Sequence, residues 1–150
     1  LAVLGKGDAD LEAEFTRVAA AYPGRIQLRI GYDESLAHKI EAGADIFLMP
    51  SRYEPSGLNQ MYSLRYGTVP VVRATGGLDD TIDEETGFKF HESSGGALLQ
   101  AVRAAAAAFS DKENWTVRIK RGMSKDFCWS ASAEAYSTLY KGLLTGRTQA

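Results

Sequence analysis

The sequence is poor in cysteine, in long apolar runs and in net charge, and each shortage excludes a class of protein. The single cysteine, Cys128, excludes an internal disulfide and a metal site built from cysteines, and it suits a reducing compartment. No apolar run approaches the length that is needed to span a bilayer. A net charge of −2 gives no broad basic field for nucleic acid or anionic lipid, so any phosphate must be recognised locally.

What is present is the composition of an ordinary globular domain. Hydrophobic residues make up 45% and charged residues 24% of the 150 positions, which is enough to build a core. The chain opens on Leu1-Ala2-Val3-Leu4, a strand pattern without an initiator methionine. We therefore expect a segment of a longer protein, incomplete at its N-terminal side.

Short apolar strands and amphipathic helices alternate along the chain. Strands are expected at residues 2–4, 26–30, 45–49, 69–72 and 87–90, and helices at 8–22, 34–43, 59–67, 78–82, 96–109, 112–123 and 131–144. Such alternation is typical of a parallel sheet that helices cover on both faces. The pattern predicts one Rossmann-like α/β domain over residues 1–150 that lacks its first strand and helix.

The stretch Pro50-Ser51-Arg52-Tyr53-Glu54-Pro55-Ser56-Gly57-Leu58 connects an expected buried strand to an expected helix. It places the Glu54 carboxylate and several free backbone N–H groups at the carboxyl end of a strand and the positive end of a helix. Sugar phosphates bind at such places. In the other interpretation Glu54 caps the helix and the Pro/Gly pair only shapes a turn, and the flanking elements leave both open.

Two further features follow expected strands. Thr75-Gly76-Gly77-Leu78 is a second turn with exposed backbone groups. Because adjacent parallel strands end on the same side of a sheet, this turn could line the same crevice as the Glu54 loop. Taken alone, it is typical of an ordinary glycine turn. Tyr32 can stack on a nucleotide base from its place after residues 26–30, or it can be a half-buried surface aromatic. Gly5-Lys6-Gly7-Asp8 lacks the third glycine of a dinucleotide fingerprint, so it predicts only a tight turn.

The histidines and the acidic residues do not indicate a metal site. His38 and His91 lack any metal-ligand spacing, which favours structural or solvent-facing roles. The acidic residues between positions 79 and 85 are typical of a solvated loop face.

Taken together, the motifs resemble the C-terminal, donor-binding half of the bacterial glycogen synthase and plant starch synthase family. These are retaining glucosyltransferases with two Rossmann-like domains, of the GT-B type. The likeness lies in residues 30–34 (Ile-Gly-Tyr-Asp-Glu), 47–62 around the Glu-Pro-Ser-Gly loop, 65–72, 75–81 and the tail from Asp126 to Ser130 with Tyr136 and Tyr140.

The resemblance implies a reaction and a set of site residues. Glucose would pass from ADP-glucose to the non-reducing end of an α-1,4-glucan with retention, with ADP-glucose as co-substrate and no metal or other cofactor. Glu54 would help to hold the donor glucose as the catalytic acidic residue, and Tyr32 would stack on the adenine. The other implied site residues bind the sugar and the distal phosphate or line the donor crevice: Ser56, Gly57, Leu58 and Asn59, and Thr75, Gly76 and Gly77.

The chain departs from the family in three places. Ser56 stands where the family usually has cysteine, and Tyr62 stands where many related transferases carry a second glutamate. Residues 83–87 look shorter than the usual connection. The family's basic Arg/Lys pair and its acceptor domain would lie upstream of Leu1, so we expect the 150-residue chain to be inactive alone. Detectable glucan elongation by it would refute this.

The resemblance also sets expectations for partners and place. A nucleotide sugar and, through an upstream domain, an α-1,4-glucan are expected to bind, but no nucleic acid and no membrane. The expected location is the bacterial cytoplasm, or the plastid for a plant or algal protein. Two other readings remain. One is a donor domain for a UDP- or GDP-sugar, or a sucrose synthase relative. The other is a non-catalytic nucleotide- or glycan-binding module, for which Glu54→Gln would leave turnover intact.

Overall fold

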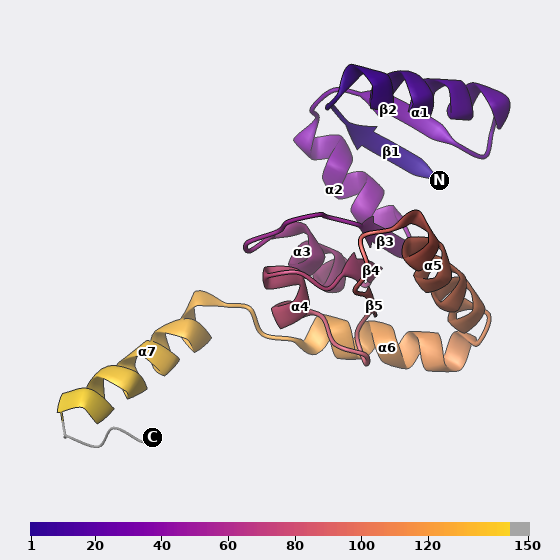
Figure 1. The fold of residues 1–150 in the computed structure, drawn as a ribbon. Coiled ribbons are helices and arrows are strands. Elements are labelled where there is room, and N and C mark those ends of the chain that lie inside the picture. The colour runs from indigo at the N-terminus through magenta and orange to yellow at the C-terminus, as the bar shows by residue number, and fades with distance from the viewer. Residues whose placement is uncertain (145–150) are drawn as a thin grey trace. The chain divides into compact units, whose positions relative to one another are not determined.

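A computed structural model of the chain describes residues 1–144, and its elements alternate as the sequence predicts (Figure 1). In chain order they are β1 (Ala2–Gly5), α1 (Ala9–Ala21), β2 (Gln27–Ile30), α2 (Glu34–Gly43), β3 (Ile46–Met49), α3 (Asn59–Tyr66), β4 (Val69–Arg73), α4 (Gly77–Thr81), β5 (Phe88–Phe90), α5 (Gly95–Phe109), α6 (Lys112–Ser124) and α7 (Trp129–Leu144). Each expected strand and helix is present, and its ends differ from the expected ones by no more than a residue or two.

The chain divides into two compact units, residues 1–45 and 46–150, which we describe separately. In the first unit β1 and β2 pair in parallel, with Ala2 opposite Gln27 and Gly5 opposite Ile30. Asp8 caps α1, because its carboxylate accepts the backbone N–H of Asp10 at 2.9 Å. The prediction that the whole chain forms one domain stays a prediction.

The apolar face expected on α1 is only partly covered within this unit. Leu11 is 62% exposed and Phe15 44% exposed, and α1 has no buried residue. The reason is that a sheet of only two strands lies beside α1 in its own unit. A hollow of about 200 Å³ remains there, lined by the Gly5–Asp8 turn, by Leu11 and Phe15, and by Ile30 among others.

The second unit holds a parallel sheet in the order β3-β4-β5, and neighbouring residues of the central strand face opposite layers. Val72 packs with Leu64 of α3 and Leu78 of α4. Val71 packs with Phe90 and with Ala101 of α5. The predicted α/β class with helices on both faces of a parallel sheet is therefore confirmed.

Helix α6 packs against this core through Trp115 and Gly122. Trp115 is buried, and its ring lies 5.2 Å from Phe109, edge to face, and 6.3 Å from Phe88. Gly122 lies against Leu64, where an added Cβ would come within 2.8 Å of the leucine side chain. The residues of α7, by contrast, include none that is buried.

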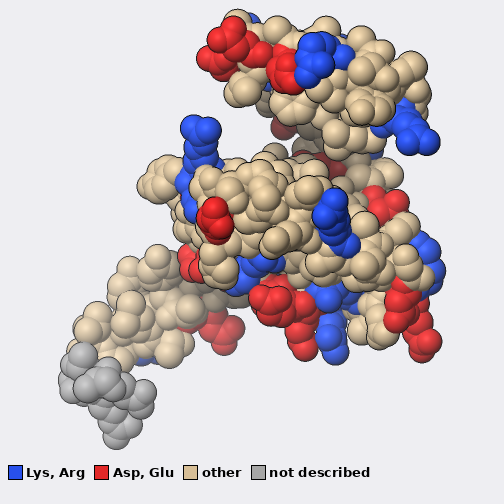
Figure 2. Space-filling view, turned by 45° about the vertical axis from the view of Figure 1, so that its right-hand side comes forward, with Lys and Arg blue, Asp and Glu red and all other residues tan. Residues whose placement is uncertain are grey.

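Basic and acidic side chains both lie on the face of the molecule that Figure 2 draws. Figure 2 shows basic and acidic side chains interspersed among other residues on one face, in keeping with the net charge of −2. Over residues 1–144, no helix has both the length and the apolar character that crossing a bilayer requires.

Candidate functional site

The loops that follow β3 and β4 interlock at the carboxyl edge of the second sheet. The Gly77 N–H donates to the carbonyl oxygen of Glu54 at 3.1 Å. A Cβ on Gly76 would lie 2.2 Å from that same oxygen, and a Cβ on Gly77 would lie 2.0 Å from the Ser56 carbonyl oxygen. The Thr75-Gly76-Gly77 turn therefore touches the Glu54–Gly57 loop backbone to backbone, which only glycine permits. The two turns that the sequence placed in one crevice do meet.

The start of α3 presents open backbone donors. Gly57 has φ = +70°, and Leu58 follows it with right-handed helical angles. A left-handed residue followed by a right-handed one turns successive N–H groups toward one point, which forms an anion-binding nest. Within the part of the chain that the structure describes, the N–H groups of Gly57, Leu58 and Asn59 have no recorded acceptor. These donors lie at the N-terminus of α3, which is the positive end of the helix dipole.

Glu54 is half-buried beside this nest and does not cap α3. Its Cγ lies 3.2 Å from where a Cβ on Gly57 would stand. No side chain caps α3, so the interpretation of Glu54 as a helix cap is wrong. Ser56 and Asn59 are exposed at the same place, and Leu58 is 54% exposed.

Gln60 and Arg73, for which no role was predicted, donate hydrogen bonds to backbone carbonyl groups of the loop between β3 and α3. The buried Gln60 amide nitrogen donates to the carbonyl oxygens of Ser56 and Gly57, each at 3.1 Å. The Arg73 guanidinium donates from Nε to the Ser51 carbonyl at 2.7 Å, and also to the carbonyls of Arg52 and His91. The available sequence signals were a glutamine among the apolar positions of the helix and an arginine that ends an apolar strand.

Tyr32 lies in the first unit, directly after β2, and is 89% exposed. Gly31 before it has φ = +138° and donates to the Gly5 carbonyl at 2.8 Å. The Gly5–Asp8 segment forms the predicted tight turn, closed by a bond of 2.8 Å from the Gly7 N–H to the Glu12 carboxylate. The association of Tyr32 with Glu54 stays a prediction.

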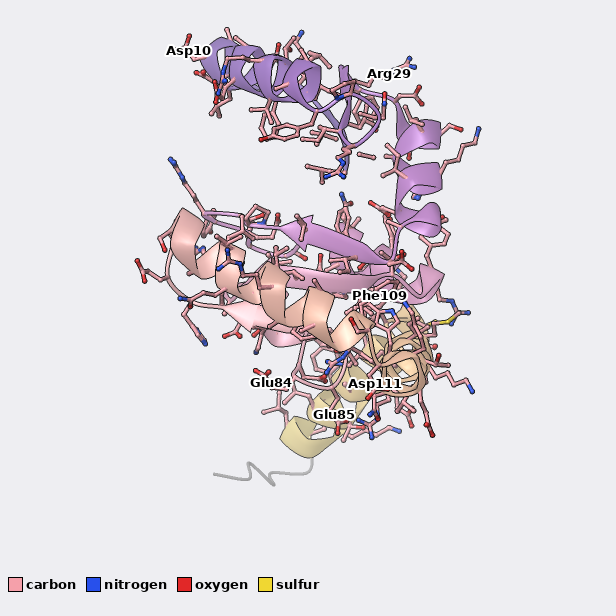
Figure 3. The ribbon with its side chains drawn as sticks, turned by 90° about the vertical axis from the view of Figure 1, so that its right-hand side faces the viewer. Asp10, Arg29, Glu84, Glu85, Phe109 and Asp111 are labelled. Carbon is pink, nitrogen blue, oxygen red and sulfur yellow. The ribbon has the colours of Figure 1, made fainter. Side chains whose placement is uncertain are left out.

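Three of the five acidic residues between positions 79 and 85 form ion pairs with basic side chains. Asp79 meets Lys89 at 2.7 Å, Asp83 meets Lys125 at 2.6 Å, and Glu85 meets Arg121 at 3.2 Å. The hydrogen bond from Lys89, together with its charge, holds the pKa of Asp79 below its usual range. Glu84 and Glu85 lie in the loop between α4 and β5 (Figure 3), and the Glu84 carbonyl accepts a bond from Arg118.

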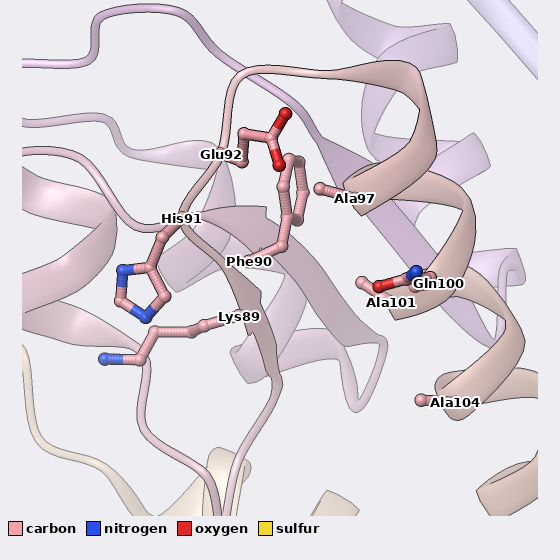
Figure 4. Close-up of a pocket in the computed structure, with 8 residues that line it drawn as sticks. All are labelled: Lys89, Phe90, His91, Glu92, Ala97, Gln100, Ala101 and Ala104. Carbon is pink, nitrogen blue, oxygen red and sulfur yellow. The ribbon is translucent and has the colours of Figure 1, made fainter.

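A separate hollow of about 400 Å³ lies between β5 and α5 (Figure 4). Its lining comes from Lys89 to Glu92 on one side and from Ala97 to Ala104 on the other. None of the predicted site residues lines it. Across residues 1–144, no three His, Cys, Asp or Glu side chains gather as a metal site would require.

Comparison with known proteins agrees with this architecture. Residues 2–119 match the family described as "Glycosyl transferases group 1". The chain is 55% identical to a glycogen synthase of Anaeromyxobacter dehalogenans (strain 2CP-1 / ATCC BAA-258) over 97% of its own length and 32% of that protein. It therefore spans less than a third of the length of that relative.

Two solved structures share the fold. The catalytic domain of starch synthase IV from Arabidopsis thaliana, bound to ADP and acarbose, superimposes with a TM-score of 0.79 at 34% identity, over 93% of this chain and 31% of that one. Sucrose-phosphate synthase from Thermosynechococcus elongatus superimposes with a TM-score of 0.68 at 24% identity, over 97% of this chain and 39% of that one. The second similarity is of fold alone.

Proposed function

The chain belongs to the Glycosyl transferases group 1 family, and from this premise we propose that it is the donor-binding part of a glycogen synthase. The complete synthase would transfer glucose from ADP-glucose to the non-reducing end of an α-1,4-glucan with retention. The identity of 55% to a glycogen synthase supports this choice over other members of the family. The starch synthase neighbour, whose structure holds ADP and acarbose, supports a nucleotide and a glucan as ligands.

The observation that carries the proposal is the nest at Gly57–Asn59 beside the Glu54 carboxylate. The distal phosphate of the donor would accept hydrogen bonds from these N–H groups, helped by the dipole of α3. Backbone donors fixed before the reaction stabilise the negative charge that develops on a departing diphosphate. This requirement also explains how Ser56 can replace cysteine, since the backbone would do the binding.

Glu54 would accept hydroxyl groups of the donor glucose. Glu54 is half-buried and lies in the same loop as the nest, so adjacent groups would bind the sugar and the distal phosphate. Thr75, Gly76 and Gly77 would line the crevice from the second turn. Tyr32 would stack on the adenine with its exposed ring.

Nucleotide titration tests the donor. The complete synthase should bind ADP more tightly than UDP by calorimetry, and ADP-glucose should outcompete UDP-glucose as donor. A preference for UDP would contradict the donor assignment while leaving the family intact. If neither nucleotide binds, the site itself is contradicted.

Glu54→Gln in the complete synthase tests the catalytic assignment. We expect kcat to fall by about 100-fold, because groups that grip the reacting sugar act mainly in the transition state. The matched control is Glu92→Gln, an exposed glutamate outside the crevice, which should leave kcat unchanged. Unchanged turnover in Glu54→Gln would favour a non-catalytic binding module.

A further inference from the structure

The orientation of the nest depends on one buried side chain, and we infer that Gln60 is a positioning residue for the distal phosphate of the donor. The inference rests on the proposed function and adds to it a residue that does not touch the ligand. Gln60 is fully buried at the first turn of α3.

The hydrogen-bond pattern fixes which way the Gln60 amide points. Its nitrogen has three oxygen neighbours: the Ser56 and Gly57 carbonyls at 3.1 Å and the Thr81 hydroxyl at 3.2 Å. The Thr81 hydroxyl gives its own proton to the Gly77 carbonyl at 2.5 Å, so toward Gln60 it can only accept. Three acceptors require the NH2 group on this side, with one of its two hydrogens shared.

Holding two successive carbonyls determines where the next N–H groups point. In a trans peptide the carbonyl and the following N–H lie on opposite sides of the bond. Gln60 draws the Ser56 and Gly57 carbonyls inward, so the N–H groups of Gly57 and Leu58 point the other way. The nest would therefore be oriented before a ligand arrives.

The oxygen of the Gln60 amide indicates that the NH2 group is the part that matters at this position. The Gln60 Oε1 atom is buried and has no hydrogen-bond partner within residues 1–144. A methionine of similar size would fill the same space without burying an unsatisfied acceptor. Burying that unsatisfied oxygen costs free energy, which the hydrogen bonds of the NH2 group offset. Thr81 extends the link to the second turn through Gly77, so one amide joins both loops of the crevice.

The test compares ADP with AMP in the complete synthase. Gln60→Met should weaken ADP binding about tenfold, because only ADP carries the distal phosphate that the nest would hold, and AMP affinity should change by less than about twofold. Gln60→Glu should weaken ADP further, because an ionised carboxylate would face three acceptor oxygens. Gln100→Met and Gln100→Glu, at an exposed glutamine of α5, are the matched controls and should change neither affinity.

A loss of ADP and AMP affinity in equal proportion, or unchanged ADP binding in Gln60→Met, would overturn the inference. A ligand-free readout separates this result from failure of the proposed function. The Met61 and Tyr62 amides bond to the Leu58 carbonyl at 2.9 and 3.0 Å, and they should exchange hydrogen faster in Gln60→Met. If wild type binds no nucleotide but this exchange rises, the proposed function fails and the loop-holding role of Gln60 stands. Unchanged exchange overturns that role.

Discussion

Glycine-containing turns follow strands in both units of the chain, yet they are built in different ways. At Gly5 and Gly7 an added Cβ would meet nothing within 4 Å. At Gly76 and Gly77 it would strike the backbone of the facing loop at 2.2 and 2.0 Å. The glycines of the first turn thus have open space around them, whereas those of the second are packed against the backbone of another loop.

The two units also differ in how many apolar side chains they bury. Within residues 1–45 no apolar side chain is buried, whereas the second unit buries both faces of its central strand. Close contact between backbones therefore occurs where a packed sheet fixes the loops. A site that needs its donors aligned to within an ångström is expected on such a rigid support.

Gly77→Ala is the substitution that should separate the two kinds of turn most strongly. The new methyl group would overlap the Ser56 carbonyl, so we expect a loss of unfolding free energy of about 3 kcal/mol or more. Thermal or urea unfolding measures it. Gly7→Ala is the matched control and should stay within about 0.5 kcal/mol of wild type. Similar losses in both variants would abolish the contrast.

Gly57→Ala should affect the nest more than the fold. The left-handed φ of +70° costs alanine roughly 1–2 kcal/mol. The new Cβ would also come within 2.6 Å of the Gln60 Oε1 atom, which must move. Calorimetry should show ADP affinity reduced by about tenfold or more, since the peptide that carries the donors would rotate. Wild-type affinity would mean that the nest tolerates another backbone geometry.

Asp8→Ala tests whether the open turn depends on its local cap. Asp8 accepts the N–H groups of Asp10 and Leu11 at 2.9 and 3.4 Å. Its removal should destabilise α1 by about 1 kcal/mol, seen as faster hydrogen exchange in residues 9–21. Asp8→Asn should behave like wild type within a few tenths of a kcal/mol, because asparagine caps equally well. No change in exchange would show that α1 is held by something other than its cap.

The sequence predicted the elements well because their signals are local. Apolar alternation and spacing identified the strands and helices, because these patterns depend on residues only a few positions apart. The meeting of the two turns was also predictable, since neighbouring parallel strands end at one edge. These inferences needed no knowledge of side-chain contacts.

The roles of Gln60 and Arg73 could not be predicted in the same way. Both side chains donate to backbone carbonyl oxygens of a loop. Every residue has such a carbonyl, so the sequence does not show which carbonyl groups come together around one side chain. The partial exposure of the apolar face of α1 within its own unit was likewise not predictable from the sequence. Periodicity reports an apolar stripe, but not the area of the surface that covers it.

The smallest expected effect concerns the ion pairs that hold residues 79–87 against α6. Burial alone would raise the pKa of Asp83, but hydrogen bonds from Lys125 and Thr86 outweigh it and lower the pKa below its ordinary 3.8. The unfolded chain then binds the proton more readily, so this pair stabilises the fold above the ordinary pKa, and the contribution is lost as the pH falls below it. Because half of the Asp83 side chain is exposed, the pair should contribute less than about 1 kcal/mol.

Lys125→Met should therefore reduce stability slightly at pH 7 and less at pH 3, as followed by urea unfolding. Lys120→Met, at an exposed lysine within α6, is the control and should show no such pH dependence. If the two variants respond to pH alike, the Asp83–Lys125 pair does not hold this loop. The turn at Gly76 and Gly77 would then owe its position to its backbone contact with the Glu54–Gly57 loop and to the hydrogen bonds of Gln60 and Thr81, which would sharpen its contrast with the open turn of the first unit.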